Sequence, residues 1–201
     1  NITAPSITVT QGTCSATSNV FKPVGQSSVS AGTFIVTSTS GVASYNTLTI
    51  TAPSGFVIST NDSYNSSDDQ QTLTLTSNIS SSTTYYVFFV GSSDASGQVS
   101  FGDAASSKTS CSFSAKIPTL ALSPSSITLS KTSTSQVVTI TSNLSGATLQ
   151  LSGTNASSFS VSPTSVTFSG GTATVTVSVS GEIPNEGLVA TLTATNSTYN
   201  I

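Results

Sequence analysis

The sequence contains no arginine, histidine, methionine or tryptophan, and only four lysines and seven acidic residues among 201. These absences remove most of the side chains that enzymes use. A classical catalytic triad needs a base, usually histidine, between the nucleophile and its orienting acid. A structural zinc ion needs four ligands, which two cysteines without histidine do not supply. We therefore expect neither an enzyme nor a metalloprotein, and no cofactor.

The shortage of positive charge also limits the partners. The net charge is −3 and the isoelectric point is near 4.3, so nucleic acid is not an expected partner. No apolar run approaches the roughly 20 residues that a membrane-spanning helix needs. The sequence begins with Asn1 and shows no signal peptide, and from this we expect a processed, exported chain.

Serine and threonine take the place of charge, with about 80 of the 201 residues. Disordered chains combine low hydrophobicity with high net charge, whereas here 35% of the residues are hydrophobic and regularly spaced. In residues 172–179, Ala173, Val175, Val177 and Val179 share one face and Thr or Ser occupies the other. Residues 47–51, 72–76 and 188–195 repeat this period of two, which is typical of antiparallel strands buried on one face.

The strand candidates recur every 8 to 12 residues between turn signals, which is typical of β-sandwiches. The aromatic run at residues 85–89 indicates a central strand buried on both faces. The best boundary lies at Lys116-Ile117-Pro118. The expected fold is all-β, with two immunoglobulin-like antiparallel sandwiches in series at residues 13–116 and 117–201. Residues 1–12 are expected to form an extended N-terminal segment.

Cys14 and Cys111 are the only two cysteines. Cys111 shares its parity with Phe113 and Ala115, which places it in the core of the first domain, and Cys14 can reach it from the partner sheet. We expect an intramolecular disulfide, which implies an oxidising compartment. Two buried free thiols are the alternative.

The sequence gives only weak signals for two other kinds of chemistry, calcium binding and an isopeptide bond. The segment at residues 61–69 is rich in oxygen ligands for Ca²⁺, but it lacks the glycine and distal glutamate of an EF-hand loop, so a solvated turn is favoured. A Lys–Asn isopeptide bond remains an alternative, with Lys22, Lys108 or Lys116 as the lysine.

Seven of the eleven asparagines stand in the N-x-S/T context of N-glycosylation. A surface with so little charge tends to associate and precipitate, and attached glycans would supply the missing hydration. The acceptor asparagines are Asn61, Asn65, Asn78, Asn143, Asn155, Asn196 and, with less support, Asn1.

These features together resemble the subunits of archaeal threads, which are glycosylated surface pili of acidophilic archaea whose subunits join head to tail by donor strand complementation. The resemblance covers the whole chain in architecture and composition. Residues 51–56 and 162–168 also resemble repeats of bacterial surface adhesins. The thread resemblance implies an extracellular homopolymeric filament of identical subunits.

On this interpretation, residues 1–10 leave their own subunit and complete the sheet of a neighbour, with Ile2, Ala4, Ile7 and Val9 as the inserted side chains. Ile7 and Val9 alternate with Ser6, Thr8 and Thr10, while Pro5 permits a bend before them. An ordinary first strand within its own sandwich is the alternative at this level. For the function, the alternative is an adhesin stalk or a carbohydrate-binding surface module.

Overall fold

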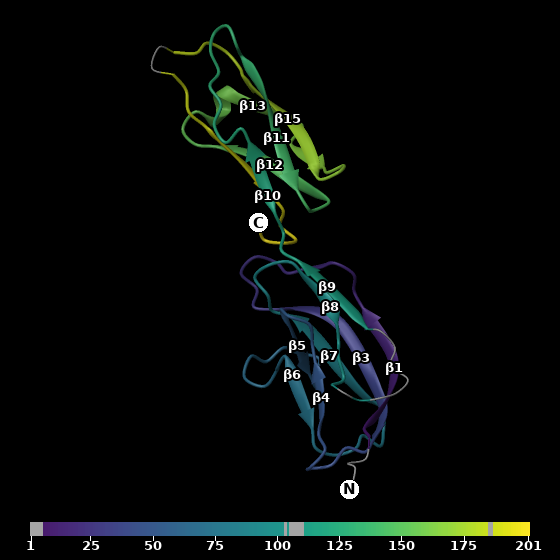
Figure 1. Ribbon diagram of the computed structural model, residues 1–201. Coiled ribbons are helices and arrows are strands. Elements are labelled where there is room, and N and C mark those ends of the chain that lie inside the picture. Colours follow the sequence, from purple (N-terminus) through teal and green to yellow (C-terminus); the bar gives the residue numbers. More distant parts are fainter. Residues whose placement is uncertain (1–5, 103, 105–110, 185–186) are drawn as a thin grey trace. The chain divides into compact units, whose positions relative to one another are not determined.

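The computed structural model describes residues 6–102, 104, 111–184 and 187–201. These residues form sixteen β-strands and one 3-10 turn, Ala156–Ser158, so the protein is all-β as the sequence predicted. Among the described residues, no helix has the length and apolar character that crossing a membrane requires. The chain divides into two compact units, Asn1–Ile117 and Pro118–Ile201 (Figure 1).

Unit 1 is built from two facing sheets. The first has the antiparallel order β1-β3-β7-β5, the second has the order β2-β9-β8, and β4 pairs with β6. Paired hydrogen bonds of 2.9 Å between Thr51 and Ser100 connect the end of β4 to the chain that follows β8. The strands are β1 (Thr8–Ala16), β2 (Val20–Phe21), β3 (Val29–Ser40), β4 (Leu48–Thr51), β5 (Phe56–Ser59), β6 (Thr72–Leu75), β7 (Thr83–Phe89), β8 (Ala95–Gln98) and β9 (Ser112–Lys116).

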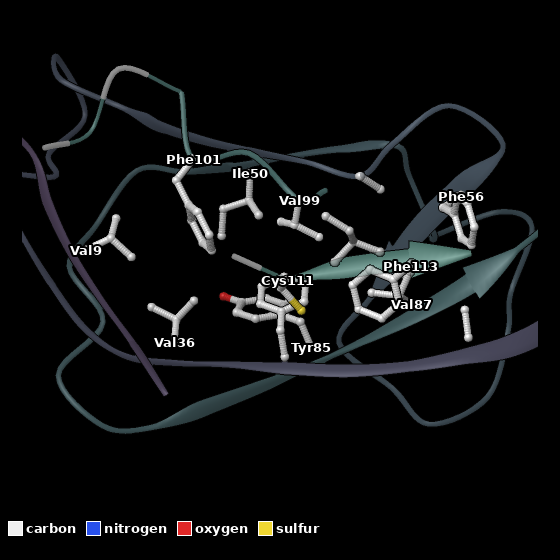
Figure 2. Close-up of a cluster of buried hydrophobic side chains, with 14 of the residues drawn as sticks. Val9, Val36, Ile50, Phe56, Tyr85, Val87, Val99, Phe101, Cys111 and Phe113 are labelled. Carbon is white, nitrogen blue, oxygen red and sulfur yellow. The ribbon is translucent and has the colours of Figure 1, made fainter. Parts of the chain in front are cut away.

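The core of unit 1 lies between these sheets, and aromatic rings join them (Figure 2). Phe56 of β5 and Phe113 of β9 come from opposite sheets, with their ring centroids 6.3 Å apart. The predicted central strand is confirmed, because β7 pairs with β3 on one side and β5 on the other. Val87 and Phe89 are fully buried, and Phe88 on the opposite face packs against Tyr64.

Burial raises the pKa of Tyr85, whose ring stacks on Phe34. The folded chain therefore holds this proton more tightly than the unfolded chain, whose tyrosines titrate near 10.0. Ionisation of Tyr85 should therefore have no effect on the free energy of unfolding below about pH 9. It should lower that free energy as the pH rises past about 10. Thermal melts of the wild type and Tyr85→Phe between pH 7 and 11 check this. The wild type should lose melting temperature relative to Tyr85→Phe as the pH rises past about 10, and a separation that stays constant with pH would contradict the assignment.

Unit 2 is a second sandwich, with one sheet in the order β10-β11-β15-β13 and another in the order β14-β12-β16. The alternation seen in the sequence places Val175 and Val177 in its core, beside Val138, Ile140 and Leu149. The strands are β10 (Leu120–Ser123), β11 (Ser135–Ser142), β12 (Gly146–Ser152), β13 (Phe159–Ser162), β14 (Ser165–Thr167), β15 (Thr172–Val179) and β16 (Thr191–Thr195).

The last strand differs from its prediction. The alternating pattern covers residues 188–195, but the strand begins only at Thr191. Residues 191–195 pair with β12, whereas 188–190 have no strand partner among the described residues. An alternating pattern of apolar and polar residues indicates which side chains would point to the same face of a strand. A strand forms only where a neighbouring backbone also supplies hydrogen-bond partners.

Candidate functional site: the N-terminal strand and the acceptor asparagines

A disulfide joins Cys14 of β1 to Cys111, which directly precedes β9, with the two Cα atoms 5.7 Å apart. The predicted bond is confirmed, and it connects the two sheets of unit 1. Cys111 is buried beside the core residue Phe113. The second half of β1 is therefore tied covalently to the opposite sheet.

The first half of β1, residues 8–10, is held by strand pairing and not by a covalent bond. Thr8, Val9 and Thr10 pair antiparallel with Ser40, Thr39 and Ser38 of β3. Val9 is fully buried and Ile7 packs against the core, while Thr8 and Thr10 are exposed. The alternation read from the sequence is thus present, and it turns Val9 toward the core of the same chain.

This pairing differs from the expectation that residues 1–12 form a detached segment. In the single chain, β1 spans Thr8–Ala16 and pairs with β3 of its own sheet. The physical reason is the burial of Val9, which a free segment would leave in water. Two of the expected donor residues, Ile2 and Ala4, lie outside the described residues, as does Asn1.

β1 is nonetheless an edge strand made of two unequal halves. It stands at the end of the order β1-β3-β7-β5, and its register with β3 shifts between Thr10 and Gln11 and again between Gln11 and Cys14. Such irregularities interrupt the ladder and let a strand bend. The register shifts therefore divide β1 into Thr8–Thr10 and a second half that carries Cys14 and its disulfide.

Gln11 lies at this boundary with its side chain turned inward. It is only 9% exposed, and neither its Nε2 nor its Oε1 atom has a hydrogen-bond partner among the described residues. The buried Gln11 side chain therefore marks the junction between the two halves of β1.

The acidic loop at residues 61–69 uses its polar groups to stabilise itself. The Asp69 carboxylate accepts a hydrogen bond from the backbone N–H of Asn65 at 2.8 Å, and Asp68 accepts one from the Asn65 side chain at 2.6 Å. The described residues contain no group of three or more His, Cys, Asp or Glu side chains placed to hold a metal ion. The hydrogen bonds within the loop are those of a self-stabilised turn.

The lysines suggested for an isopeptide bond are placed as follows. The Lys22 Nζ atom donates to the carbonyl oxygen of Gln26 at 3.3 Å and lies 5.9 Å from the centre of the Phe89 ring. Lys116 is half-buried in β9, and Lys108 lies outside the described residues. Lys22 thus faces a carbonyl and an aromatic ring.

The described acceptor asparagines differ in how their side chains are used. Asn61 and Asn65 are exposed in the loop after β5, and the Nδ2 atom of Asn65 donates to Asp68 at 2.6 Å. Asn78 and Asn143 are exposed too, and their carbonyl oxygens accept backbone N–H groups at 2.9 and 2.8 Å. Asn155 is half-buried and accepts the N–H of Val189 at 3.1 Å. Because glycans attach through Nδ2, bonds to the oxygen are compatible with modification.

Asn196 is built into the fold of unit 2. Its Nδ2 atom donates to the carbonyl of Gly146 at 2.8 Å, and its Oδ1 atom accepts the N–H groups of Thr198 and Tyr199 at 3.1 and 3.3 Å. The side chain thereby fixes the C-terminal turn to the start of β12. Sequence reasoning did not separate Asn196 from the other acceptors, because the tripeptide signal carries no information about these contacts.

This difference yields a prediction for the expected glycosylation of the native chain. Asn61→Gln should remove the mass of one glycan and leave the melting temperature nearly unchanged. Asn196→Gln should leave the mass of attached glycan unchanged but lower the free energy of unfolding by about 1 kcal/mol, because partly buried hydrogen bonds are lost. Intact mass spectrometry and thermal melts measure both effects. A native mass equal to the bare 20.1 kDa chain would contradict glycosylation altogether.

Comparison with known protein families and with curated proteins finds no match for this chain.

Proposed function

We propose that the chain is the structural subunit of an extracellular, glycosylated filament. In the filament, the N-terminal segment of one subunit, residues 1–10, completes a β-sheet of the next. The contact is asymmetric and does not close on itself, so it propagates head to tail. The subunit performs no catalysis, and its task is to polymerise and to withstand its surroundings.

The two-part construction of β1 is the observation that carries this proposal. A strand that passes to a neighbour must leave its own sheet while its own domain stays folded. The register shift after Thr10 provides a place to separate, and the Cys14–Cys111 bond keeps the remaining half in place. The first half lies at a sheet edge, where exchange of an identical element between copies has a low cost.

Releasing the first half of β1 has an energetic cost. Exposing the buried Val9 side chain costs about 1.5–3 kcal/mol. Ile7, which packs against the same core, adds to that cost. The ladder hydrogen bonds with β3 are replaced by those in the neighbouring subunit. Whether the strand passes to the neighbour therefore depends on how much apolar surface it buries in the neighbouring subunit.

An extracellular location is supported by the disulfide, because such bonds persist in oxidising environments. A surface poor in charge and rich in Ser and Thr responds little to acid, which suits a filament exposed to the medium. The acceptor asparagines that lie exposed, such as Asn61 and Asn65, add a site for hydrating glycans on that surface.

Electron microscopy of the native surface material tests the proposal. We expect uniform filaments whose only abundant protein, identified by mass spectrometry, is this chain. An adhesin stalk or carbohydrate-binding module would instead appear as single particles or as part of a larger protein. Native material that holds the chain only in non-filamentous form would contradict the proposed function.

A further inference from the structure

The outer surface of the larger sheet of unit 2 is lined with hydroxyl groups. The alternation in β15 turns its central valines into the core and leaves Thr174 and Thr176 on the opposite face. Because β10, β11, β15 and β13 are neighbours in that order (Figure 1), hydroxyl residues of the other strands lie beside them. Thr139 pairs with both Ser123 and Thr174, and Thr176 pairs with Ser162. We call the outward side chains of these four strands the hydroxyl face.

Val137 of β11 provides an apolar centre for the hydroxyl face. It is 55% exposed and lies opposite Thr176, in the row next to Thr139 and Thr174. It does not reach the core of its own unit, because the following residue, Val138, takes the inward position and is buried. An apolar centre with a polar surround is typical of protein interfaces.

The hydroxyl face is also uncharged. The four strands contain no Asp, Glu or Lys, and none of the acceptor asparagines lies in them. A charged partner would lose hydration at this face without gaining an opposite charge. A second copy of the face meets it without charge repulsion, although the chain as a whole carries a net charge of −3. Each hydroxyl group can both donate and accept a hydrogen bond, so the face is complementary to itself.

The size of the hydroxyl face limits the kind of contact that it makes. Neighbouring strands lie about 4.8 Å apart and rise about 3.3 Å per residue, so four strands of this length expose about 400 Å². A stable complex of two proteins buries about 800 Å² on each partner. One contact of this size therefore does not hold two single subunits together. Repeated at every subunit of a filament, the same contact gains strength through multivalency.

We propose that the hydroxyl face binds the same face of a subunit in a second filament, so that filaments associate side by side. The inference rests on the proposed function and names a further partner of the same subunit. The contact is isologous, with the same patch on both copies. Val137 of each copy packs against the other copy, and the surrounding hydroxyl groups exchange hydrogen bonds. Because each contact is weak, side-by-side association requires filaments and does not occur between single subunits.

Thr174 and Thr193 provide a matched pair of test sites. Both are exposed strand threonines of unit 2, but Thr174 lies on the hydroxyl face and Thr193 lies on β16 of the other sheet. We expect Thr174→Lys to lower the fraction of filaments in bundles by about tenfold or more, since it places a charge against the facing copy at every subunit. Thr193→Lys should bundle like the wild type. Low-speed sedimentation and electron microscopy measure the bundled fraction, and both variants should form single filaments of normal length.

A photo-crosslinking residue at position 137 identifies the partner directly. Unlabelled and ¹⁵N-labelled filaments are assembled separately, mixed in equal amounts and left to associate, and crosslinked peptides are sequenced by mass spectrometry. We expect crosslinks from position 137 to β11 and β15, with pairs mixed in isotope because they join two filaments. Crosslinks to any other segment or to another protein, or the absence of crosslinks, would overturn the assignment.

The failure of this inference is distinguishable from failure of the proposed function. If wild-type filaments form but stay single at every concentration, the subunit polymerises and the hydroxyl face does not join filaments. If Thr193→Lys reduces bundling as much as Thr174→Lys does, added charge alone disperses the filaments and the assignment of this face is wrong. If the wild-type chain forms no filaments, both proposals fail together.

Discussion

Chains that lack residues 1–10 are expected to form no filaments. The deletion removes the segment that passes to the neighbour, including Ile7 and Val9, but leaves Gln11 and the Cys14–Cys111 bond in place. The truncated chain should remain folded and monomeric, because the disulfide still joins the two sheets of unit 1. Its melting temperature should fall, since the core loses the cover that Val9 provides.

A peptide with the sequence of residues 1–10 is the control for this deletion. Added in excess, it should raise the melting temperature of the truncated chain, because a ligand that binds only the folded state stabilises it. It should not restore filaments, because the peptide is not attached to a second subunit. Normal filaments from the truncated chain, measured by sedimentation and electron microscopy, would rule out strand exchange through this segment.

Loss of the disulfide is expected to have the largest effect on stability. The bond closes a loop with a sequence separation of 97 residues, and loops of about this length gain up to roughly 4.7 kcal/mol in the chain-entropy model. Replacing both Cys14 and Cys111 by Ala should lower the free energy of unfolding of unit 1 by about 2–5 kcal/mol. Denaturant titration measures the loss.

Unit 2 is the internal control for the disulfide variant, because both cysteines lie in unit 1. Amide hydrogen exchange, read by mass spectrometry, should be faster in peptides of Asn1–Ile117 and unchanged in those of Pro118–Ile201. If amide protection falls equally in both units, the two units do not unfold independently. No loss in unit 1 would mean that the bond adds nothing to its stability.

Local patterns predicted those parts of the fold that depend on neighbouring residues. The alternation at residues 172–179 predicts β15 because it describes which side chains face the core, and Val175 and Val177 are buried as expected. The disulfide followed from the parity of Cys111 and from the absence of other cysteines. The aromatic run at residues 85–89 predicted a central strand because large apolar side chains on both faces of a strand favour burial on both sides.

The features that the sequence does not reveal depend on pairing between distant strands. Residues 188–190 alternate but have no strand partner, and β1 turns Val9 into its own sheet. The register shift after Thr10 and the burial of the Gln11 side chain arise only when β1 meets β3. The engagement of Asn196 with Gly146 likewise joins residues far apart in the chain.

A cryo-electron microscopy map of the assembled filament is the most direct test of the central claim, that the N-terminal segment of one subunit completes a sheet of the next. In this map, the backbone that precedes Gln11 can be followed from its own subunit to the place where it lies. We predict density for residues 1–10 lying as a strand in the adjacent subunit, with Ile7 and Val9 turned into its core. A map in which Thr8, Val9 and Thr10 still pair with β3 of the same subunit would contradict the account.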